Sequence, residues 1–168
     1  MIHQASIIDK KAKLQNGVEV GAHSVIGEKV EIGKNTKIDP HVIIEGSTKI
    51  GSNCRIYPFA SLGLEPQDTK YDGEESFLEI GNNNTIREYV SINRGSVKGD
   101  RLTKVGNNNW IMPYCHIAHD CIVGSNITMS NGTTLGGHVV IKDFVNLGRL
   151  TGVHQFCRVG EYSLAGKQ

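Results

Sequence analysis

Four histidines lie close together in the second half of the chain: His116, His119, His138 and His154. His119 is followed directly by Asp120. An imidazole titrates near neutral pH, and a neighbouring carboxylate can orient it, so His119 is suited to accept a proton from an attacking hydroxyl or amine. Gly137 has no side chain, so its backbone N–H is open to an incoming carbonyl oxygen and can stabilise an oxyanion. These residue types predict acyl transfer or hydrolysis.

Whether these residues meet depends on the repeat that carries them. Ten residues spaced six apart are all Ile, Leu or Val, namely Ile8, Leu14, Val20, Ile26, Ile32, Ile38, Ile44, Ile50, Ile56 and Leu62. Such a short fixed period indicates a parallel β-helix. If three hexads make one triangular coil, residues 18 apart stack about 4.8 Å apart. The position after the repeat residue is often Gly, and Asn is frequent at the two positions after that. Because Gly and Asn tolerate positive φ, this pattern predicts tight corners with positive φ.

The repeat is interrupted twice and is still running at the end of the sequence. Residues 64–77 lack the sixfold pattern, and residues 94–104 replace one hexad with a longer basic loop. We expect both segments to project from the prism as loops, where binding residues tend to lie. A single domain of about eight coils over residues 1–168 is predicted. Because a solenoid end needs a polar cap, we expect a truncated chain, a missing domain or a cap from another chain.

The coil spacing brings polar residues into one column. Ile92, Ile117, Leu135 and Val153 occupy the same repeat position in consecutive coils. The residues two positions after them are Arg94, His119, Gly137 and Gln155. Asp120 and His138 flank this column on one side and His154 on the other. Arg94, Gln155 and the other histidines are suited to hold a polar, phosphate-bearing partner.

Two other interpretations of the histidines were considered. They are either solvated residues on an exposed strand face or, through the His116-x-x-His119 spacing, zinc ligands. The chain lacks the His-x-x-x-x-His element of the trimeric zinc sites in γ-class carbonic anhydrases. We therefore predict no metal and no cofactor.

Composition excludes several classes of protein. Eighteen basic and 17 acidic side chains give a formal charge of +1, which does not favour nucleic-acid binding. No segment looks like a secretion signal or reaches membrane-spanning length, so a cytoplasmic location is expected. The four cysteines form no C-x-x-C pair and all occupy one repeat position. We expect them to be buried, reduced corner residues.

Six segments together resemble one enzyme family. They are H-I-A-H-D-C at 116–121, G-G-H at 136–138, V-H-Q-F-C at 153–157, Q-D-T-K-Y at 67–71, I-N-R-G at 92–95 and L-T-K-V-G at 102–106. In their order along the chain they are similar to the signature segments of the acyl-[acyl-carrier-protein]–UDP-N-acetylglucosamine O-acyltransferases, hexapeptide-repeat enzymes that begin lipid A synthesis. The resemblance runs along essentially the whole chain.

The resemblance implies an all-β, left-handed parallel β-helix that forms a homotrimer with clefts between subunits. It implies transfer of an R-3-hydroxyacyl group from acyl carrier protein to the 3-position of UDP-N-acetylglucosamine. By this resemblance His119 is expected to be the general base, Asp120 to assist it, and the Gly137 N–H to bind the oxyanion. The substrate-binding residues implied are Gln67, Asp68, Lys70, Asn93, Arg94, His116, His138, His154 and Gln155.

The sequence departs from the family at three places. Asn93 replaces a common histidine, which bears on whether the acceptor is a hydroxyl or an amine. Gly166 and Lys167 fall at the hydrocarbon ruler, and the long Lys167 side chain predicts a preference for a shorter acyl chain. The family's C-terminal helical region is absent. Two alternatives stay open: an acyl-CoA-dependent hexapeptide acyltransferase acting on another sugar nucleotide, and an inactive or structural β-helix core.

Overall fold

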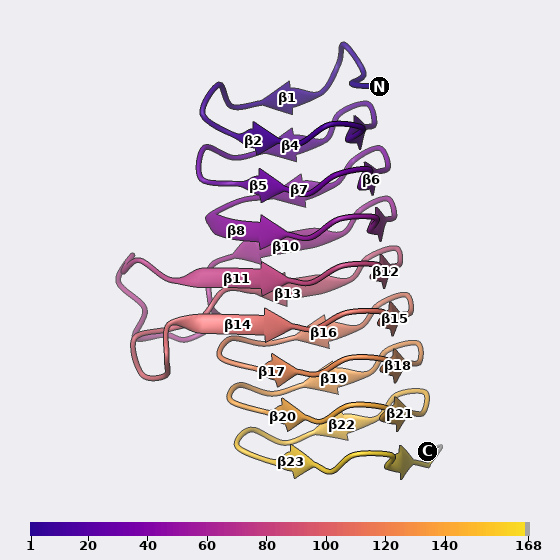
Figure 1. Ribbon diagram of the computed structural model, residues 1–168. Coiled ribbons are helices and arrows are strands. Elements are labelled where there is room, and N and C mark those ends of the chain that lie inside the picture. Colours follow the sequence, from indigo (N-terminus) through magenta and orange to yellow (C-terminus); the bar gives the residue numbers. More distant parts are fainter. Residues whose placement is uncertain (167–168) are drawn as a thin grey trace.

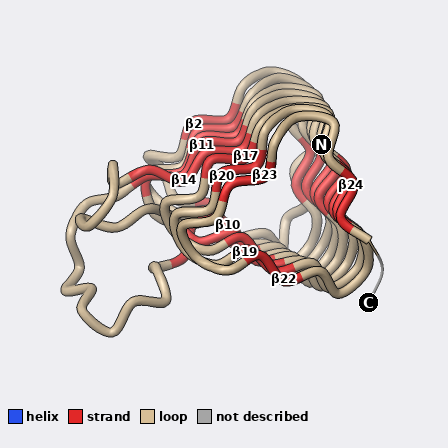
Figure 2. The backbone as a smooth tube through the Cα atoms, turned by 90° about the horizontal axis from the view of Figure 1, so that it is seen from below, coloured by secondary structure: helices blue, strands red, loops and turns tan. Residues whose placement is uncertain are grey.

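The hexads form a stack of short parallel strands in the computed structural model, which describes residues 1–166 (Figure 1). The strands form three eight-stranded parallel sheets, and no helix is present in this range. The prediction of a left-handed parallel β-helix is confirmed. Figure 2, along the axis, shows the triangular cross-section.

The three sheets are named by their first strands. The β1 sheet contains β1 (Ile7–Ile8), β4 (Val25–Ile26), β7 (Ile43–Ile44), β10 (Ser61–Leu64), β13 (Ser91–Asn93), β16 (His116–Ile117), β19 (Thr134–Leu135) and β22 (Gly152–Val153). The β2 sheet contains β2 (Lys13–Leu14), β5 (Glu31–Ile32), β8 (Ser47–Ile50), β11 (Phe77–Ile80), β14 (Leu102–Val105), β17 (Ile122–Val123), β20 (Val140–Ile141) and β23 (Arg158–Val159). The β3 sheet contains β3 (Glu19–Val20), β6 (Lys37–Ile38), β9 (Arg55–Ile56), β12 (Thr85–Ile86), β15 (Trp110–Ile111), β18 (Thr128–Met129), β21 (Asn146–Leu147) and β24 (Leu164–Ala165).

The aliphatic repeat residues make the core. Ile44, Leu62, Ile92 and Ile117 lie in consecutive coils of the β1 sheet, and each is fully buried. Burying such a side chain contributes about 1.5–3 kcal/mol relative to leaving it exposed. Because the parallel register repeats from coil to coil, each of these residues packs on its equivalent above and below. The core is therefore a continuous aliphatic column, as the sixfold spacing predicts.

The corners differ in part from the prediction. Positive φ occurs at Asn35 (56°) and Asn53 (57°), as expected for asparagine, but also at bulkier corner residues such as Phe59 (64°). Gly33 and Gly51, which directly follow repeat residues, do not have positive φ, so that part of the prediction is wrong. A Cβ on Gly33 would lie 2.5 Å from the carbonyl carbon of Gly51. These glycines allow successive coils to stack closely.

One corner carries a ladder of stacked rings. His23, His41, Phe59, Tyr89 and Tyr114 follow one another with ring centroids 5.0–5.2 Å apart. The two histidines of the first coils therefore stack with the aromatic residues that follow them. Such aromatic pairs contribute about 0.5–1.5 kcal/mol beyond their buried area.

Three of the four cysteines agree with the prediction. Cys54, Cys115 and Cys121 are buried, and burial raises the pKa of Cys115 to about 11 and of Cys121 to about 12. Their thiols are therefore protonated and unreactive at neutral pH. Cys157 is exposed, so the prediction is wrong there. It occupies the same corner position, but within residues 1–166 no further coil stacks on that corner.

Two loops interrupt the prism and project from the same corner, between the β1 and β2 sheets (Figure 2). The first loop, residues 65–76, joins β10 to β11. The second loop, residues 94–101, joins β13 to β14. It ends three residues earlier than the sequence suggested, because Leu102–Val105 pairs in register with Phe77–Ile80. Across the described range, no helix offers the length and apolarity that a membrane crossing needs.

Candidate active site

The predicted general base lies at the corner from which the two loops project. His119 follows β16, and the pairing of Ile117 with Leu135 places it beside Gly137 of the next coil. A Cβ on Gly137 would lie 2.7 Å from Cε1 and 2.9 Å from Nε2 of His119. Only a glycine leaves room for the ring, so His119 and Gly137 adjoin as the sequence spacing predicts.

His119 and Asp120 form a hydrogen-bonded pair. His119 Nδ1 lies 2.8 Å from Asp120 Oδ2, and their side chains are 15% and 3% exposed. The Asp120 carboxylate already accepts hydrogen bonds from Ser96, so it acts as the acceptor toward Nδ1 as well. The neutral imidazole therefore carries its proton on Nδ1, which leaves a lone pair on Nε2. That nitrogen is available as a base on the side facing Gly137.

Gly137 contributes an unused hydrogen-bond donor. Its carbonyl accepts from Phe156 N at 3.1 Å, but no acceptor for its own N–H is found within residues 1–166. The neighbouring Gly136 N–H, by contrast, donates to Val153 O at 2.9 Å. The Gly137 N–H thus lies next to the His119 ring with its hydrogen-bonding capacity free, which is what an oxyanion requires.

His138 lies beside this pair. Its ring stacks on Phe156 with centroids 4.6 Å apart and meets the His119 ring edge-on at 5.2 Å. His138 Nε2 is 3.9 Å from Asp120 Oδ2, beyond hydrogen-bond distance. One ligand atom from each of His119, Asp120 and His138 lies within 4.8 Å of the others, so these three residues could hold a metal ion. This group includes His119 but not His116, so it differs from the His116–His119 pair that the sequence spacing suggested.

The second loop supplies partners for Asp120 that the sequence did not identify. Ser96 donates to the carboxylate from its backbone N–H, at 3.0 Å to Oδ1, and from its hydroxyl, at 2.6 Å to Oδ2. Thr103 of β14, the strand that follows this loop, accepts a hydrogen bond at Oγ1 from the Asp120 N–H at 2.8 Å. Ser96 lies outside the hexad repeat, so no periodic signal could have placed it here.

The first loop brings Asp68 toward the same corner. Asp68 Oδ2 lies 2.6 Å from Lys98 Nζ of the second loop, and Oδ1 accepts from the Lys70 N–H at 3.0 Å. The hydrogen bond from Lys98 lowers the pKa of Asp68, with smaller effects from the Lys70 N–H and from the charge of His119. Lys98 was not anticipated from the sequence. The two loops are therefore joined at Asp68, one of the predicted substrate-binding residues.

Arg94 points away from the histidine column. Its guanidinium is 13% exposed and donates to Gly63 O at 2.9 Å and to the Tyr71 hydroxyl at 2.8 Å. Asn93 is buried and donates from Nδ2 to Glu65 O at 2.7 Å. Both residues fasten the first loop to the prism. Together with Gln67 they line a separate cavity of about 510 Å³.

The remaining predicted residues lie around the corner or farther along the stack. His116 Nδ1 is 2.7 Å from Ser91 Oγ, a partner that the sequence did not suggest. His154 and Gln155 are exposed one coil beyond Gly137. Gly166 lines an apolar cavity of about 450 Å³ on the β3 sheet side, and Lys167 lies outside the described residues.

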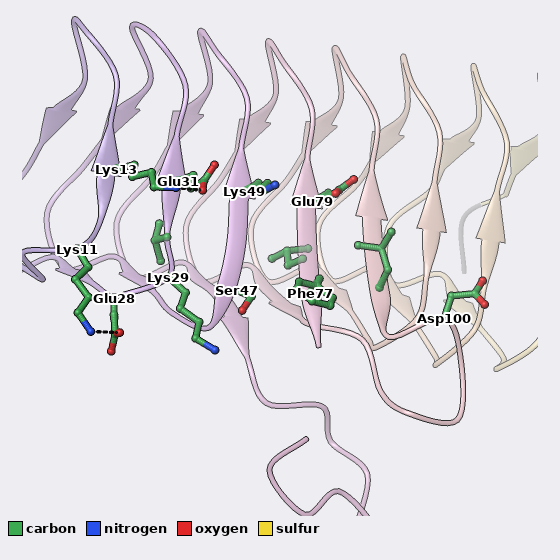
Figure 3. Close-up of a pocket in the computed structure, with 13 residues that line it drawn as sticks. Lys11, Lys13, Glu28, Lys29, Glu31, Ser47, Lys49, Phe77, Glu79 and Asp100 are labelled. Atoms are coloured by element: carbon green, nitrogen blue, oxygen red, sulfur yellow. Dashed lines mark hydrogen bonds and ion pairs between the residues drawn. The ribbon is translucent and has the colours of Figure 1, made fainter. Parts of the chain in front are cut away.

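A larger groove of about 640 Å³ runs along the β2 sheet (Figure 3). Its outward residues alternate in charge from coil to coil as Lys13, Glu31, Lys49 and Glu79. Because opposite charges adjoin along this row, the groove does not select an anion or a cation. None of the predicted site residues lines it.

The pKa of His116 gives a testable pH dependence. Burial, and secondarily the charge of His119, lowers this pKa from 6.5. Below pH 6.5 the unfolded chain binds a proton at this position that the folded chain does not. The contribution of His116 to stability is therefore full above pH 6.5 and decreases as the pH falls toward the folded-state pKa.

When the pH is lowered from about 7.5 to about 5, we expect the Tm of a His116→Asn variant to decrease less than the Tm of the parent chain. A His3→Asn variant, which replaces an exposed imidazole, controls for the loss of one histidine. Identical pH dependence in the parent chain and the His116→Asn variant would show that His116 is not coupled to folding.

The fold is that of the hexapeptide-repeat transferases. Residues 29–63 and 102–137 match the family described as "Bacterial transferase hexapeptide (six repeats)". Among curated relatives, acyl-[acyl-carrier-protein]–UDP-N-acetylglucosamine O-acyltransferases match over 98% of this chain. The protein of Herminiimonas arsenicoxydans is 52% identical and that of Janthinobacterium sp. (strain Marseille) 53%. The chain spans 63% of the length of both relatives.

Solved structures agree. The UDP-N-acetylglucosamine acyltransferase of Campylobacter jejuni superposes with a TM-score of 0.94 at 42% identity, covering 98% of this chain and 64% of that one. The enzyme of Francisella novicida gives 0.93 at 44% identity, covering 99% and 63%. The chain belongs to the family of UDP-N-acetylglucosamine O-acyltransferases.

Proposed function

We propose that this chain is the β-helical part of an acyltransferase that moves an R-3-hydroxyacyl group from acyl carrier protein to the 3-position of UDP-N-acetylglucosamine, which begins lipid A synthesis. The observation that carries the proposal is the His119–Asp120 pair lying against the free Gly137 N–H. Relatives named for this reaction match 98% of the chain at about half identity.

The first chemical step needs a base and an acceptor hydroxyl. The lone pair on His119 Nε2 removes the proton as the hydroxyl oxygen attacks the thioester carbonyl carbon. The Asp120 carboxylate holds the proton on Nδ1 and stabilises the imidazolium that forms. A base placed in this way contributes about 10²–10⁴ to the rate.

The second step needs a donor for the oxyanion and a proton for the leaving group. The Gly137 N–H stabilises the negative charge on the former carbonyl oxygen. When the carbon–sulfur bond breaks, the imidazolium of His119 returns its proton to the thiolate. The products are the O-acylated sugar nucleotide and the free thiol of the carrier.

The loops and neighbouring coils are proposed to hold the substrates. Asp68 and Lys70 of the first loop bind the sugar, and Lys98 keeps the Asp68 carboxylate in place. His116 and His138 line the same corner. His154, Gln155, Gln67, Asn93 and Arg94 remain assigned to the donor and acceptor sites as predictions.

The same proposal includes the assembly and its partners. We propose a cytoplasmic homotrimer in which a second copy closes the exposed side of the histidine corner. Acyl carrier protein is the proposed donor partner, because the curated relatives are named for it. Gly166 is proposed to border the end of the acyl chain, next to the apolar cavity of about 450 Å³.

A donor comparison tests the proposal against its alternatives. The chain is supplied with UDP-N-acetylglucosamine and with the same 3-hydroxyacyl group as a thioester of either acyl carrier protein or coenzyme A. We expect product only, or at much higher kcat/KM, from the carrier protein thioester. Faster transfer from coenzyme A would favour the acyl-CoA-dependent alternative. No product from either donor would favour a structural core.

A further inference from the structure

Two imidazoles compete for one carboxylate at this site, and the second loop separates them. We infer that Ser96 is a positioning residue that pairs Asp120 with His119 rather than with His138, and so determines which histidine is the base. The inference rests on the proposed function, because it assumes that the base at this corner performs acyl transfer. It concerns the second loop, to which the family resemblance gave no role in catalysis.

The contacts of Ser96 are directed at the carboxylate alone. Its hydroxyl lies 2.6 Å from Asp120 Oδ2, and its N–H lies 3.0 Å from Oδ1 and 3.1 Å from Oδ2. Ser96 is itself 2% exposed, so no water replaces these bonds easily. Hydrogen bonds to a charged group in such a site contribute more than those between neutral groups. Ser96 therefore fixes the rotation of the carboxylate about its Cβ–Cγ bond.

The fixed rotation favours one imidazole. With Oδ2 held by Ser96, His119 Nδ1 reaches the same oxygen at 2.8 Å, whereas His138 Nε2 stays 3.9 Å away. The His138 ring is within reach after a small movement, since it already meets the His119 ring edge-on at 5.2 Å. The difference of about one ångström between the two contacts is what the Ser96 hydroxyl maintains.

The backbone of the second loop closes the site around the carboxylate. A Cβ added to Gly99 would lie 2.5 Å from Asp120 Oδ1, so the loop contacts the carboxylate without any side chain at that position. The Asp120 side chain is consequently 3% exposed. The Ser96 hydroxyl and the Gly99 backbone restrain the carboxylate from two directions.

Removing the hydroxyl frees one lone pair of Oδ2 in a site that excludes water. The carboxylate then turns toward His138, whose Nε2–H donates to it, and His119 loses the partner that holds its proton on Nδ1. The proton of His119 then moves between its two ring nitrogens, which occupies Nε2 for part of the time. The population of the catalytic tautomer falls, although every substrate contact stays in place.

Kinetics of the Ser96→Ala variant test this directly. We expect kcat for acyl transfer to fall about 10- to 100-fold with KM nearly unchanged. Ser96→Thr keeps a hydroxyl and is expected to restore most of the rate. Gly99→Ala, which pushes on the carboxylate from the other side, is expected to lower kcat in the same way. Unchanged kcat in Ser96→Ala would overturn the inference.

The tautomer can be read without any activity. Long-range ¹⁵N–¹H spectra distinguish the two neutral forms of histidine, and we expect His119 as the Nδ1–H form in the parent chain and as a mixture in Ser96→Ala. Ser76→Ala is the matched control, because Ser76 is a buried serine whose hydroxyl has no partner within residues 1–166. It should leave the spectrum and kcat unchanged. If the parent chain transfers no acyl group, the proposed function fails, but this spectrum still tests the inference.

Discussion

Replacing His119 with alanine should lower kcat for acyl transfer by about 10²–10⁴, the usual contribution of a general base. The Nε2 lone pair of His119 lies beside the free Gly137 N–H. Asp120 stays hydrogen-bonded to Ser96 in the variant, so no bare buried carboxylate is created. We therefore expect a folded protein with nearly unchanged KM, measured by the rate of O-acylation of UDP-N-acetylglucosamine.

A matched control replaces a histidine of the ring ladder. His23 lies at another corner of the prism and stacks on His41. His23→Ala is expected to keep kcat while losing a little thermal stability. Equal rates for His119→Ala and the parent chain would remove His119 from the chemistry and favour a structural role for the cluster.

A single methyl group at Gly137 should be nearly as damaging. In Gly137→Ala, the new Cβ would lie 2.7 Å from Cε1 and 2.9 Å from Nε2 of His119, closer than real Cβ contacts. The ring must move, and the methyl group occupies the space through which a thioester carbonyl would reach the N–H. Losing one oxyanion donor costs about 10²–10³ in kcat, and we expect a decrease of this size.

Gly152→Ala is the control for this variant. Gly152 lies in β22, one coil beyond β19, and a Cβ there would meet nothing within 4 Å. The exchange should leave kcat unchanged and raise stability by about 0.4–1 kcal/mol through the unfolded state. An unchanged kcat in Gly137→Ala would contradict the assigned role of the Gly137 N–H. A large decrease in the Tm of that variant would instead attribute its loss of kcat to a disturbed fold.

Much of the site could be predicted because the repeat acts as a coordinate system. Once residues 18 apart are stacked, His119 and Gly137 must adjoin, and the pairing of Ile117 with Leu135 places them so. Asp120 needs no long-range argument because it follows His119 in the sequence. The sequence therefore predicted the parts of the site that lie on the prism itself.

The contacts of the loops could not be predicted in the same way, because the loop residues lie outside the hexad repeat. Nothing in the spacing indicates that Ser96 contacts Asp120 or that Lys98 reaches Asp68. Arg94 begins the second loop, and its side chain bonds to Gly63 and Tyr71 rather than extending the histidine column. Stacking by repeat position predicts neighbouring side chains only up to the residue at which the chain leaves the hexad repeat.

The parallel register also limits how such a gene can gain or lose codons. Strand partners are 18 positions apart in uninterrupted coils, as in Ile26 with Ile44, so deleting one hexad would rotate everything downstream by one face. If the deleted hexad lay between the second loop and β16, His119 would lie at a different corner from the loop that carries Ser96. Insertions that project as loops, such as residues 65–76, leave the later coils in place. Changes of length are therefore tolerated in the loops, whereas in the prism they are tolerated only as whole coils of three hexads.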